Sequence, residues 1–193
     1  MKVIDAVVRF DIGFSSVLTE RSIQFVEKFG QPMRVGSNEH IRLDDDIRKV
    51  SGVSLYNLVK PQAPEDICKL SMFTYIAKEL LKYSLMYRSK FSYLELNGVN
   101  QIDILKYSEN GKYTAHVDDG HDSNRTTTII LNLNDDYEGG DFIFFNPVKK
   151  NEIIHREKLK KGSLLFFPSN FLYAHSVEPI TKGTRYSIVS WMA

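Results

Sequence analysis

Two patterns of apolar residues divide the chain. Between residues 15 and 30 the apolar positions follow the period of a helix, and Gly30 ends the run. A second helical pattern opens with Pro64, Glu65 and Asp66, a typical helix start, and continues to about residue 88. Its apolar positions are Ile67, Leu70, Phe73, Ala77, Leu80, Leu81 and Leu85, and Cys68 is expected at the core or its boundary.

The pattern changes to short runs rich in β-branched and aromatic residues from about residue 91 onward. Turn signals such as Asn110-Gly111 and Gly139-Gly140 separate these runs. We predict about eight strands, in FSYLELN, QIDILKYS, KYTAHVD, TTTIILNLN, GDFIFFN, SLLFFPS, YAHSVEP and TRYSIVSWM. Residues 31–60 have neither period and are predicted to form an irregular surface arm.

Helices followed by strands indicate an α+β fold, in which a sheet sandwich or barrel has the N-terminal helices packed on one outer face. With 193 residues the chain can bury one core but is short for two domains. We therefore expect a single domain over 1–193, with helical support and a variable loop in 1–90 and a β core in 91–193.

Composition narrows the class of protein further. Hydrophobic residues make up 42% of the chain, charged residues 25%, and the formal net charge is +1. This balance favours neither a nucleic acid nor an anionic membrane as partner. Cys68 is the single cysteine, so no internal disulfide can form, and no apolar run is long enough for a signal peptide or a membrane span. We expect a cytoplasmic protein.

The candidate chemistry begins with His116 and Asp118, whose two-residue spacing places both side chains on one face of a strand. His175 and Arg185 lie in two later runs, on either side of a connection that holds Pro179 and Gly183. If those runs form a hairpin, His175 and Arg185 face each other across it. A cation so close to a histidine indicates a ligand or metal between them.

Two imidazoles and a carboxylate suit Fe(II) and leave coordination positions open for substrates. A guanidinium beside them offers a planar fork that matches the carboxylate of a bound dicarboxylic acid. The same motif has a second interpretation. His116, Asp118 and His121 could form a zinc site of a hydrolase, and a third possibility is a non-catalytic barrel that binds a small acid or a protein.

Three segments together resemble the 2-oxoglutarate- and Fe(II)-dependent dioxygenases of the prolyl 4-hydroxylase type. They are YSENGKYTAHVDD, RTTTIILNLNDDYEGGDFIFF and KLKKGSLLFFPSNFLYAHSVEPITKGTRYSIVSWM. The resemblance covers residues 91–193 and implies a double-stranded β-helix, or jelly roll. It implies that Fe(II) is bound by His116, Asp118 and His175, and that 2-oxoglutarate and O2 are cosubstrates, with ascorbate as a possible reductant.

The resemblance also suggests which residues contact 2-oxoglutarate. Arg185 would pair with its distal carboxylate, and Tyr107 matches a tyrosine that contacts the cosubstrate in relatives. Asn132 and Val189 stand where many relatives have a tyrosine and a threonine. Asn132 could still donate one hydrogen bond, and Ser187 shares the face of Arg185 by strand alternation.

The substrate implied first is a prolyl residue of a peptide or protein, with a free amino acid as an alternative and a nucleic acid disfavoured. Tyr113, Arg125 and Trp191 are candidate substrate contacts. Arg125 has a second interpretation, a solvated charge at a strand start, which we favour. The stretch DGHDSN that follows Asp118 is expected to be a loop on the substrate side.

Overall fold

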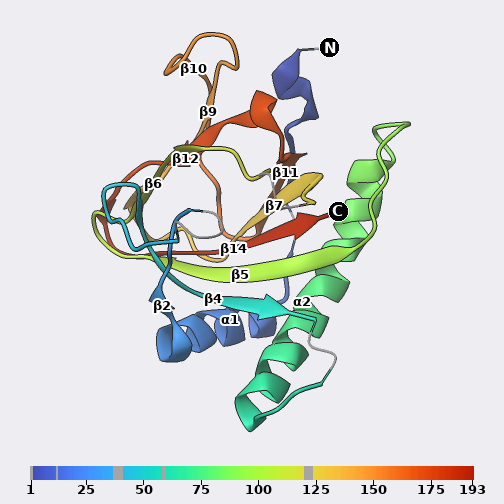
Figure 1. The fold of residues 1–193 in the computed structure, drawn as a ribbon, viewed down its shortest axis with the longest axis vertical. Coiled ribbons are helices and arrows are strands. Elements are labelled where there is room, and N and C mark those ends of the chain that lie inside the picture. The colour runs from blue at the N-terminus through green and yellow to red at the C-terminus, as the bar shows by residue number, and fades with distance from the viewer. Residues whose placement is uncertain (1, 12, 37–40, 58–59, 120–123) are drawn as a thin grey trace.

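The computed structural model describes residues 2–11, 13–36, 41–57, 60–119 and 124–193. Its strands form two main antiparallel sheets, with the orders β1-β11-β7-β14-β5-β4-β2 and β10-β9-β12-β6-β3, and a short β13-β8 pair (Figure 1). The strands are β1 (Val8–Asp11), β2 (Gln31–Pro32), β3 (Arg48–Lys49), β4 (Ser51–Tyr56), β5 (Val99–Tyr107), β6 (Lys112–His116), β7 (Thr127–Asn132), β8 (Glu138–Gly139), β9 (Phe142–Phe145), β10 (Ile153–Glu157), β11 (Ser163–Pro168), β12 (His175–Val177), β13 (Ile180–Lys182) and β14 (Arg185–Met192).

Two helices, α1 (Ser16–Phe29) and α2 (Pro64–Arg88), confirm the two helical patterns, and short 3-10 turns occupy Val3–Ala6 and Phe171–Tyr173. Ser15 caps α1 by accepting a hydrogen bond from the Leu18 amide. Asp66 does the same for α2, where its carboxylate accepts the Ala63 amide at 3.1 Å.

Both helices cover the outer face of the larger sheet, as predicted, and contact β4 and β5 (Figure 1). Ile76 and Leu80 of α2 are fully buried in one cluster with Ile102 and Ile104 of β5. The helical pattern predicts more burial than the fold provides, because several of its apolar positions face away from the sheet. Ile67, Leu81 and Leu85 are exposed, and so is Cys68, which the pattern placed at the core or its boundary.

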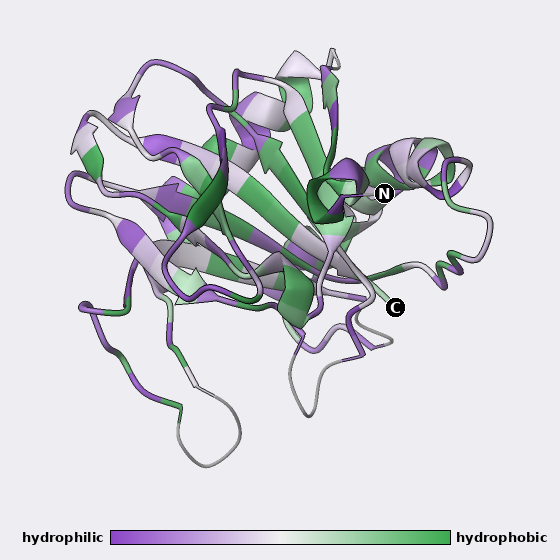
Figure 2. Ribbon diagram, turned by 90° about the horizontal axis from the view of Figure 1, so that it is seen from above, coloured by the Kyte–Doolittle hydropathy of each residue, from purple (hydrophilic) through white to green (hydrophobic). Residues whose placement is uncertain are grey.

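Strand alternation separates the two faces of the larger sheet. In β14, Ile188 joins the cluster beneath the helices, whereas Val189 packs in a second cluster between the two sheets. This inner cluster is rich in aromatic residues, and Figure 2 shows green, hydrophobic stretches along the strands, interspersed with hydrophilic ones. Residues that share the inner face of β14 with Val189 therefore point toward the space between the sheets.

The prediction of an irregular arm over 31–60 is wrong for part of that range, namely residues 31–32, 48–49 and 51–56. β2, β3 and β4 lie in it, and β4 is an interior strand of the larger sheet with Leu55 fully buried. Gly52 is required there because an added Cβ would lie 2.7 Å from Leu105 Cδ2 and 2.9 Å from the Ile104 oxygen. This glycine therefore serves the close packing of β4 against β5.

The first predicted strand, residues 91–97, is also absent. These residues form turns and an extended connection, in which the Leu94 amide donates to the Phe91 oxygen. Phe91, Leu94 and Leu96 still pack against the cluster beneath the helices. The alternating apolar side chains of this segment are thus partly buried by packing, although the segment pairs with no strand.

The predicted hairpin between His175 and Arg185 does not form. β12 lies between β6 and β9 in the smaller sheet, whereas β14 lies between β5 and β7 in the larger one. The connection through Pro179 carries β13, which pairs with β8, and so it crosses from one sheet to the other. His175 and Arg185 consequently approach the interior from opposite sheets.

Among the described residues, no helix is both long enough and apolar enough to cross a membrane.

Candidate active site

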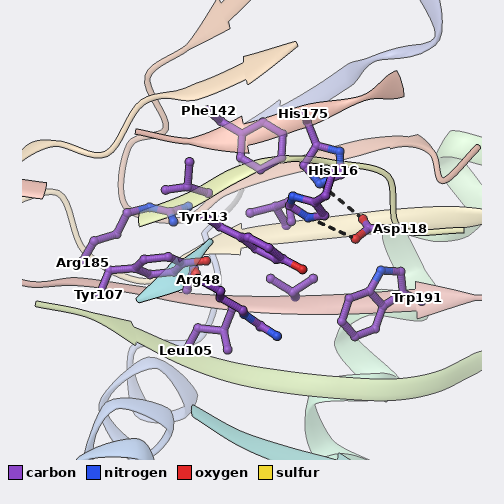
Figure 3. Close-up of a pocket in the computed structure, with 14 residues that line it drawn as sticks. Arg48, Leu105, Tyr107, Tyr113, His116, Asp118, Phe142, His175, Arg185 and Trp191 are labelled. Carbon is purple, nitrogen blue, oxygen red and sulfur yellow. Dashed lines mark ion pairs between the residues drawn. The ribbon is translucent and has the colours of Figure 1, made fainter. Parts of the chain in front are cut away.

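Three side chains with metal-binding atoms meet at the end of the smaller sheet. His116 is the last residue of β6, Asp118 follows two positions later, and His175 is the first residue of β12. β12 pairs with β6 in a register that sets His175 opposite His116. One nitrogen or oxygen atom from each of the three residues lies within 4.8 Å of the others (Figure 3).

Both imidazole rings are oriented by backbone carbonyls. His116 Nδ1 lies 2.8 Å from the Thr114 oxygen, and His175 Nδ1 lies 2.9 Å from the Tyr173 oxygen. Since a carbonyl oxygen can only accept, each Nδ1 must carry the proton, and each Nε2 presents its lone pair. These Nε2 atoms lie 3.6 Å (His116) and 3.5 Å (His175) from the carboxylate oxygens of Asp118.

The Asp118 carboxylate is fixed by neighbouring hydroxyls. Thr128 Oγ1 of β7 donates to Asp118 Oδ2 at 2.6 Å and lies 2.9 Å from Ser169 Oγ. The backbone is held too, because Arg125 donates to the Asp118 carbonyl at 3.2 Å and the Asp119 amide donates to the Ser169 oxygen. Such outer contacts orient a carboxylate for metal binding.

The protonation states also suit a metal. Burial and the neighbouring His116 lower the pKa of His175 from 6.5 to about 4, although the Asp118 charge opposes this. Burial alone would raise the pKa of Asp118, but His175, His116 and the Thr128 hydroxyl together hold it well below its ordinary value. At neutral pH the cluster therefore holds an anionic carboxylate beside a neutral His175.

This donor set fits Fe(II). Two imidazoles and one carboxylate on one side of an ion leave its remaining positions open, the arrangement of non-haem iron centres. The open side faces a cavity lined by both sheets, with apolar walls from Leu105, Ile130, Phe142, Val177 and Val189. His121, which the zinc interpretation uses, lies outside the described residues.

The far end of the cavity is cationic. Arg185 is 1% exposed, and its guanidinium carbon lies 5.3 Å from the ring centre of Tyr107, its register partner on β5. Its Nε donates to Asn132 Oδ1 at 3.1 Å, but one terminal nitrogen is buried and has no hydrogen-bond partner among the described residues. Ser187 Oγ, on the same face, is likewise buried without a partner.

A buried guanidinium is costly unless an anion and further hydrogen-bond acceptors accompany it. Within the described part of the chain, no carboxylate lies within 4 Å of Arg185. The unpartnered Arg185 nitrogen and the Ser187 hydroxyl are therefore suited to the carboxylate of a bound ligand. The residues present fit both Fe(II) and a dicarboxylate that spans from the ion to Arg185.

Asn132 differs from the expectation that it contacts the cosubstrate. It is fully buried behind Arg185, and its amide nitrogen lies within hydrogen-bond distance of the Asn134 oxygen, the Tyr137 hydroxyl and the Leu159 oxygen. Its side-chain oxygen accepts a hydrogen bond from Arg185 Nε. Asn132 is thus placed to position the guanidinium, whereas Val189 lines the cavity directly.

Two arginine–aromatic pairs border the cavity, and Figure 3 shows Arg48 and Tyr113 of the first pair and Trp191 of the second. The Tyr113 ring stacks on His116, with centroids 3.6 Å apart, and carries the Arg48 guanidinium 4.8 Å above its centre. The Arg125 guanidinium lies 3.8 Å from the ring centre of Trp191. The favoured interpretation of Arg125 as a solvated charge is therefore wrong, since it is half-buried and bonded to the Asp118 carbonyl.

Comparison with known proteins agrees with this geometry. Residues 102–193 match the sequence model of the 2OG-Fe(II) oxygenase superfamily, where 2OG is 2-oxoglutarate. The match covers slightly less than half of the chain and shows a resemblance to that superfamily. The matched range of the oxygenase core includes the three metal-binding side chains, Arg185, and all of the strands that carry them.

Relatives and solved structures extend the likeness. A PKHD-type hydroxylase of Synechococcus sp. is 33% identical over 102 residues, which are 49% of this chain and 43% of that protein, so the matched segment spans less than half of its length. A Pseudomonas putida prolyl-4-hydroxylase has a TM-score of 0.69 at 18% identity and covers 98% of this chain and 96% of its own. A Trichoplax adhaerens prolyl hydroxylase, solved with a hypoxia-inducible-factor peptide, has a TM-score of 0.70 at 16% identity, covering 98% and 86%. These structures share the double-stranded β-helix fold with this chain.

Sequence reasoning missed two residues of the site. Arg48 lies on β3, in the range assigned to an irregular arm, and the alternation of Val53 and Leu55 just after it was the available signal of strand structure. Thr128 belongs to a run of three threonines that was assigned only to a strand. Nothing in that run distinguishes the one threonine that reaches Asp118.

Proposed function

We propose that this chain is an Fe(II)- and 2-oxoglutarate-dependent dioxygenase that hydroxylates an unactivated C–H bond, with a prolyl residue of a peptide or protein as the preferred substrate. The observation that carries the proposal is the pairing of two features in one cavity. The His116, Asp118 and His175 ligand atoms lie within 4.8 Å of one another. Opposite them, Arg185 has a buried, unpartnered nitrogen.

Each residue has a distinct role in this proposal. His116, Asp118 and His175 would hold Fe(II), while Thr128 and the Thr114 and Tyr173 carbonyls orient the ligands. Arg185 and Ser187 would bind the distal carboxylate of 2-oxoglutarate, with Tyr107 as a further wall of its site. Bound Fe(II), 2-oxoglutarate and O2 would supply the oxidation: 2-oxoglutarate would lose its C1 carboxylate as CO2, one oxygen atom of O2 would enter succinate and the other would enter the product hydroxyl.

The remaining cavity residues exclude water and limit the approach of the substrate. Leu105, Ile130 and Val189 form an apolar wall beside the cosubstrate position. Tyr113 and Trp191 border the mouth, where a target side chain would enter. Two solved relatives are described as prolyl hydroxylases, and one of them holds a peptide, which supports a peptide or protein substrate here.

The test is formation of succinate from 2-oxoglutarate by the purified chain, with Fe(II) and ascorbate added and O2 present or removed. We expect turnover that requires both iron and O2 and that increases with a productive prolyl peptide. His175→Ala should abolish it, because the iron loses one of three ligands. His155→Ala is the matched control, since His155 lies on β10 and bonds to Glu157 outside the cavity.

Turnover that iron does not stimulate, or that His175→Ala leaves unchanged, would contradict the proposal. Mass spectrometry of the peptide then identifies the product. A gain of one oxygen atom on proline supports the prolyl assignment, and a gain on another residue refutes it while the dioxygenase assignment stands.

A further inference from the structure

A groove adjoins the iron cavity on its open side. It encloses about 490 Å³ and shares Arg48, Tyr113, Asp118 and Trp191 with the cavity. A substrate that lies along this groove can therefore reach the candidate metal ligands. The volume of the groove lies within the range of small-molecule pockets, roughly 300–1,000 Å³, so it can take at least a side chain and its neighbouring backbone.

The described walls of the groove carry an excess of positive charge. Three arginines line it, from three separate segments: Arg34, Arg48 and Arg125. Two acidic residues line it as well, and one of them, Asp118, is a proposed iron ligand. Asp103 is the other, and it is 2% exposed and accepts a hydrogen bond from Gln101 at 2.7 Å.

Among the described residues, these three arginines form no ion pair, whereas some other arginines of the chain do. Arg9, Arg42 and Arg156 each form an ion pair with an aspartate or glutamate. In the part of the chain that the structure describes, no carboxylate lies within 4 Å of Arg34, Arg48 or Arg125. Arg185 shares this property, and its expected partner is a ligand carboxylate.

Arg48 and Arg125 are also held in place before any ligand binds. Each guanidinium lies over an aromatic ring, Tyr113 for Arg48 and Trp191 for Arg125, which fixes its plane. Arg125 donates to the Asp118 carbonyl and the Gln101 side chain, and Arg48 donates to the Arg34 carbonyl. Arg48 Nε is buried and has no hydrogen-bond partner in the part of the chain that the structure describes. An orphaned donor beside the cavity mouth indicates an acceptor that arrives with the substrate.

We infer that the substrate is an acidic peptide, with an aspartate or glutamate next to the hydroxylated residue, and that Arg48 and Arg125 bind its carboxylate. This inference rests on the proposed function and specifies its substrate. The apolar remainder of the wall, which includes Met33, Val35, Ile41 and Tyr56, suits peptide side chains better than a phosphate backbone. The formal net charge of +1 also disfavours a nucleic acid.

The test measures binding without turnover. Fluorescently labelled peptide pools share a central proline and differ at the flanking positions, which carry glutamate, glutamine or lysine. Anisotropy is recorded under argon with the chain loaded with Fe(II) and 2-oxoglutarate. A carboxylate held by charged hydrogen bonds should bind about 10-fold tighter than the amide, with lysine weakest, and added salt should reduce the difference.

Arg48→Gln should reduce the preference for glutamate over glutamine to about 2-fold or less, because one of the two guanidinium groups that bind the carboxylate is lost. Arg125→Gln should act in the same direction, and Arg48→Gln alone carries the test if Arg125→Gln disturbs the fold. Arg21→Gln is the matched control, because Arg21 is an exposed arginine of α1 outside the groove. It should keep the full preference.

Equal binding of the three pools, or tighter binding of the lysine pool, overturns the inference. Displacement of the glutamate pool by a single-stranded oligonucleotide at lower concentration than by unlabelled glutamate peptide would also overturn it in favour of a nucleic acid. The succinate assay separates this result from the proposed function, because a chain that makes succinate but shows no acidic preference fails only here.

Discussion

Arg185 donates from Nε to Asn132 Oδ1 at 3.1 Å, while one of its terminal nitrogens is buried without a partner. Asn132 thereby fixes one edge of the guanidinium and leaves the other toward the cavity. Arg185 thus makes one contact that fixes its position, to Asn132, and keeps a second donor for a ligand. Removing the arginine and removing its support should therefore have different effects.

Arg185→Gln should weaken 2-oxoglutarate binding by at least about 30-fold, because it removes one partner of a buried charge pair. Asn132→Ala should weaken it less, since the guanidinium remains. Calorimetric titration of 2-oxoglutarate into the Fe(II)-loaded chain under argon measures both. An Arg185→Gln variant with unchanged affinity would mean that the dicarboxylate binds elsewhere.

Thr128→Val should reduce Fe(II) affinity by about 10–100-fold, because the substitution keeps the volume of the side chain but removes the hydroxyl that donates to Asp118. Thr128→Ser keeps the hydroxyl and should restore most of the affinity. Competition with a coloured chelator measures iron binding in both. If valine binds iron as well as threonine does, Asp118 does not depend on this contact.

Gln101 links the groove to the metal site, because it donates to Asp103 at 2.7 Å and lies 3.4 Å from Arg125, which in turn bonds the Asp118 carbonyl. Gln101→Glu would set two carboxylates against each other and should raise the KM for the peptide substrate more than it lowers kcat. In the double variant that combines Gln101→Glu with Asp103→Asn, the new amide at position 103 can donate a hydrogen bond to the new carboxylate at position 101. Steady-state kinetics should show recovery in the double variant, and two additive losses would contradict the link.

Acid should destabilise the metal-free chain over a defined range of pH. The pKa of His175 falls from 6.5 to about 4 in the fold, so between these values the unfolded chain binds a proton that the native chain excludes. Stability is therefore lost as pH decreases from about 6.5 to 4, by about 3 kcal/mol from this residue. The lowered pKa of Asp118 adds a loss only at still lower pH.

Urea unfolding in the presence of a chelator, from pH 7 to pH 4.5, measures this effect. His175→Gln removes the titrating group and should flatten the curve, whereas His155→Ala, a half-exposed histidine outside the cavity, should not. A wild-type curve as flat as that of His175→Gln would contradict the assigned burial of His175.

The two helices and most of the β core could be predicted because their apolar periods match their burial. α1, α2 and the strand β7, whose six residues are all buried, follow the patterns directly. Short strands escaped prediction where tertiary contacts decide the structure. β4 depends on a glycine packed against Leu105, and β3 is two residues long and gains its partner only from β6.

The candidate ligands could be named from sequence because His116 and Asp118 are two residues apart and His175 occurs in a recognisable segment. The residues that hold these side chains in position could not be predicted. Arg48, Thr128 and the role of Asn132 depend on which strands become neighbours, and spacing along the chain does not encode that. The predicted meeting of His175 and Arg185 failed for the same reason, since a local hairpin was assumed where the chain crosses between sheets.

The most direct test of the account is anaerobic titration of the chain with Fe(II) and 2-oxoglutarate, followed by visible absorption. Chelation of iron by the keto acid at His116, Asp118 and His175 should produce a charge-transfer band that requires both additions. His175→Ala should abolish the band and His155→Ala should keep it. Absence of the band in the wild-type chain, or its persistence in His175→Ala, would contradict the assignment of this cavity as an iron and 2-oxoglutarate site.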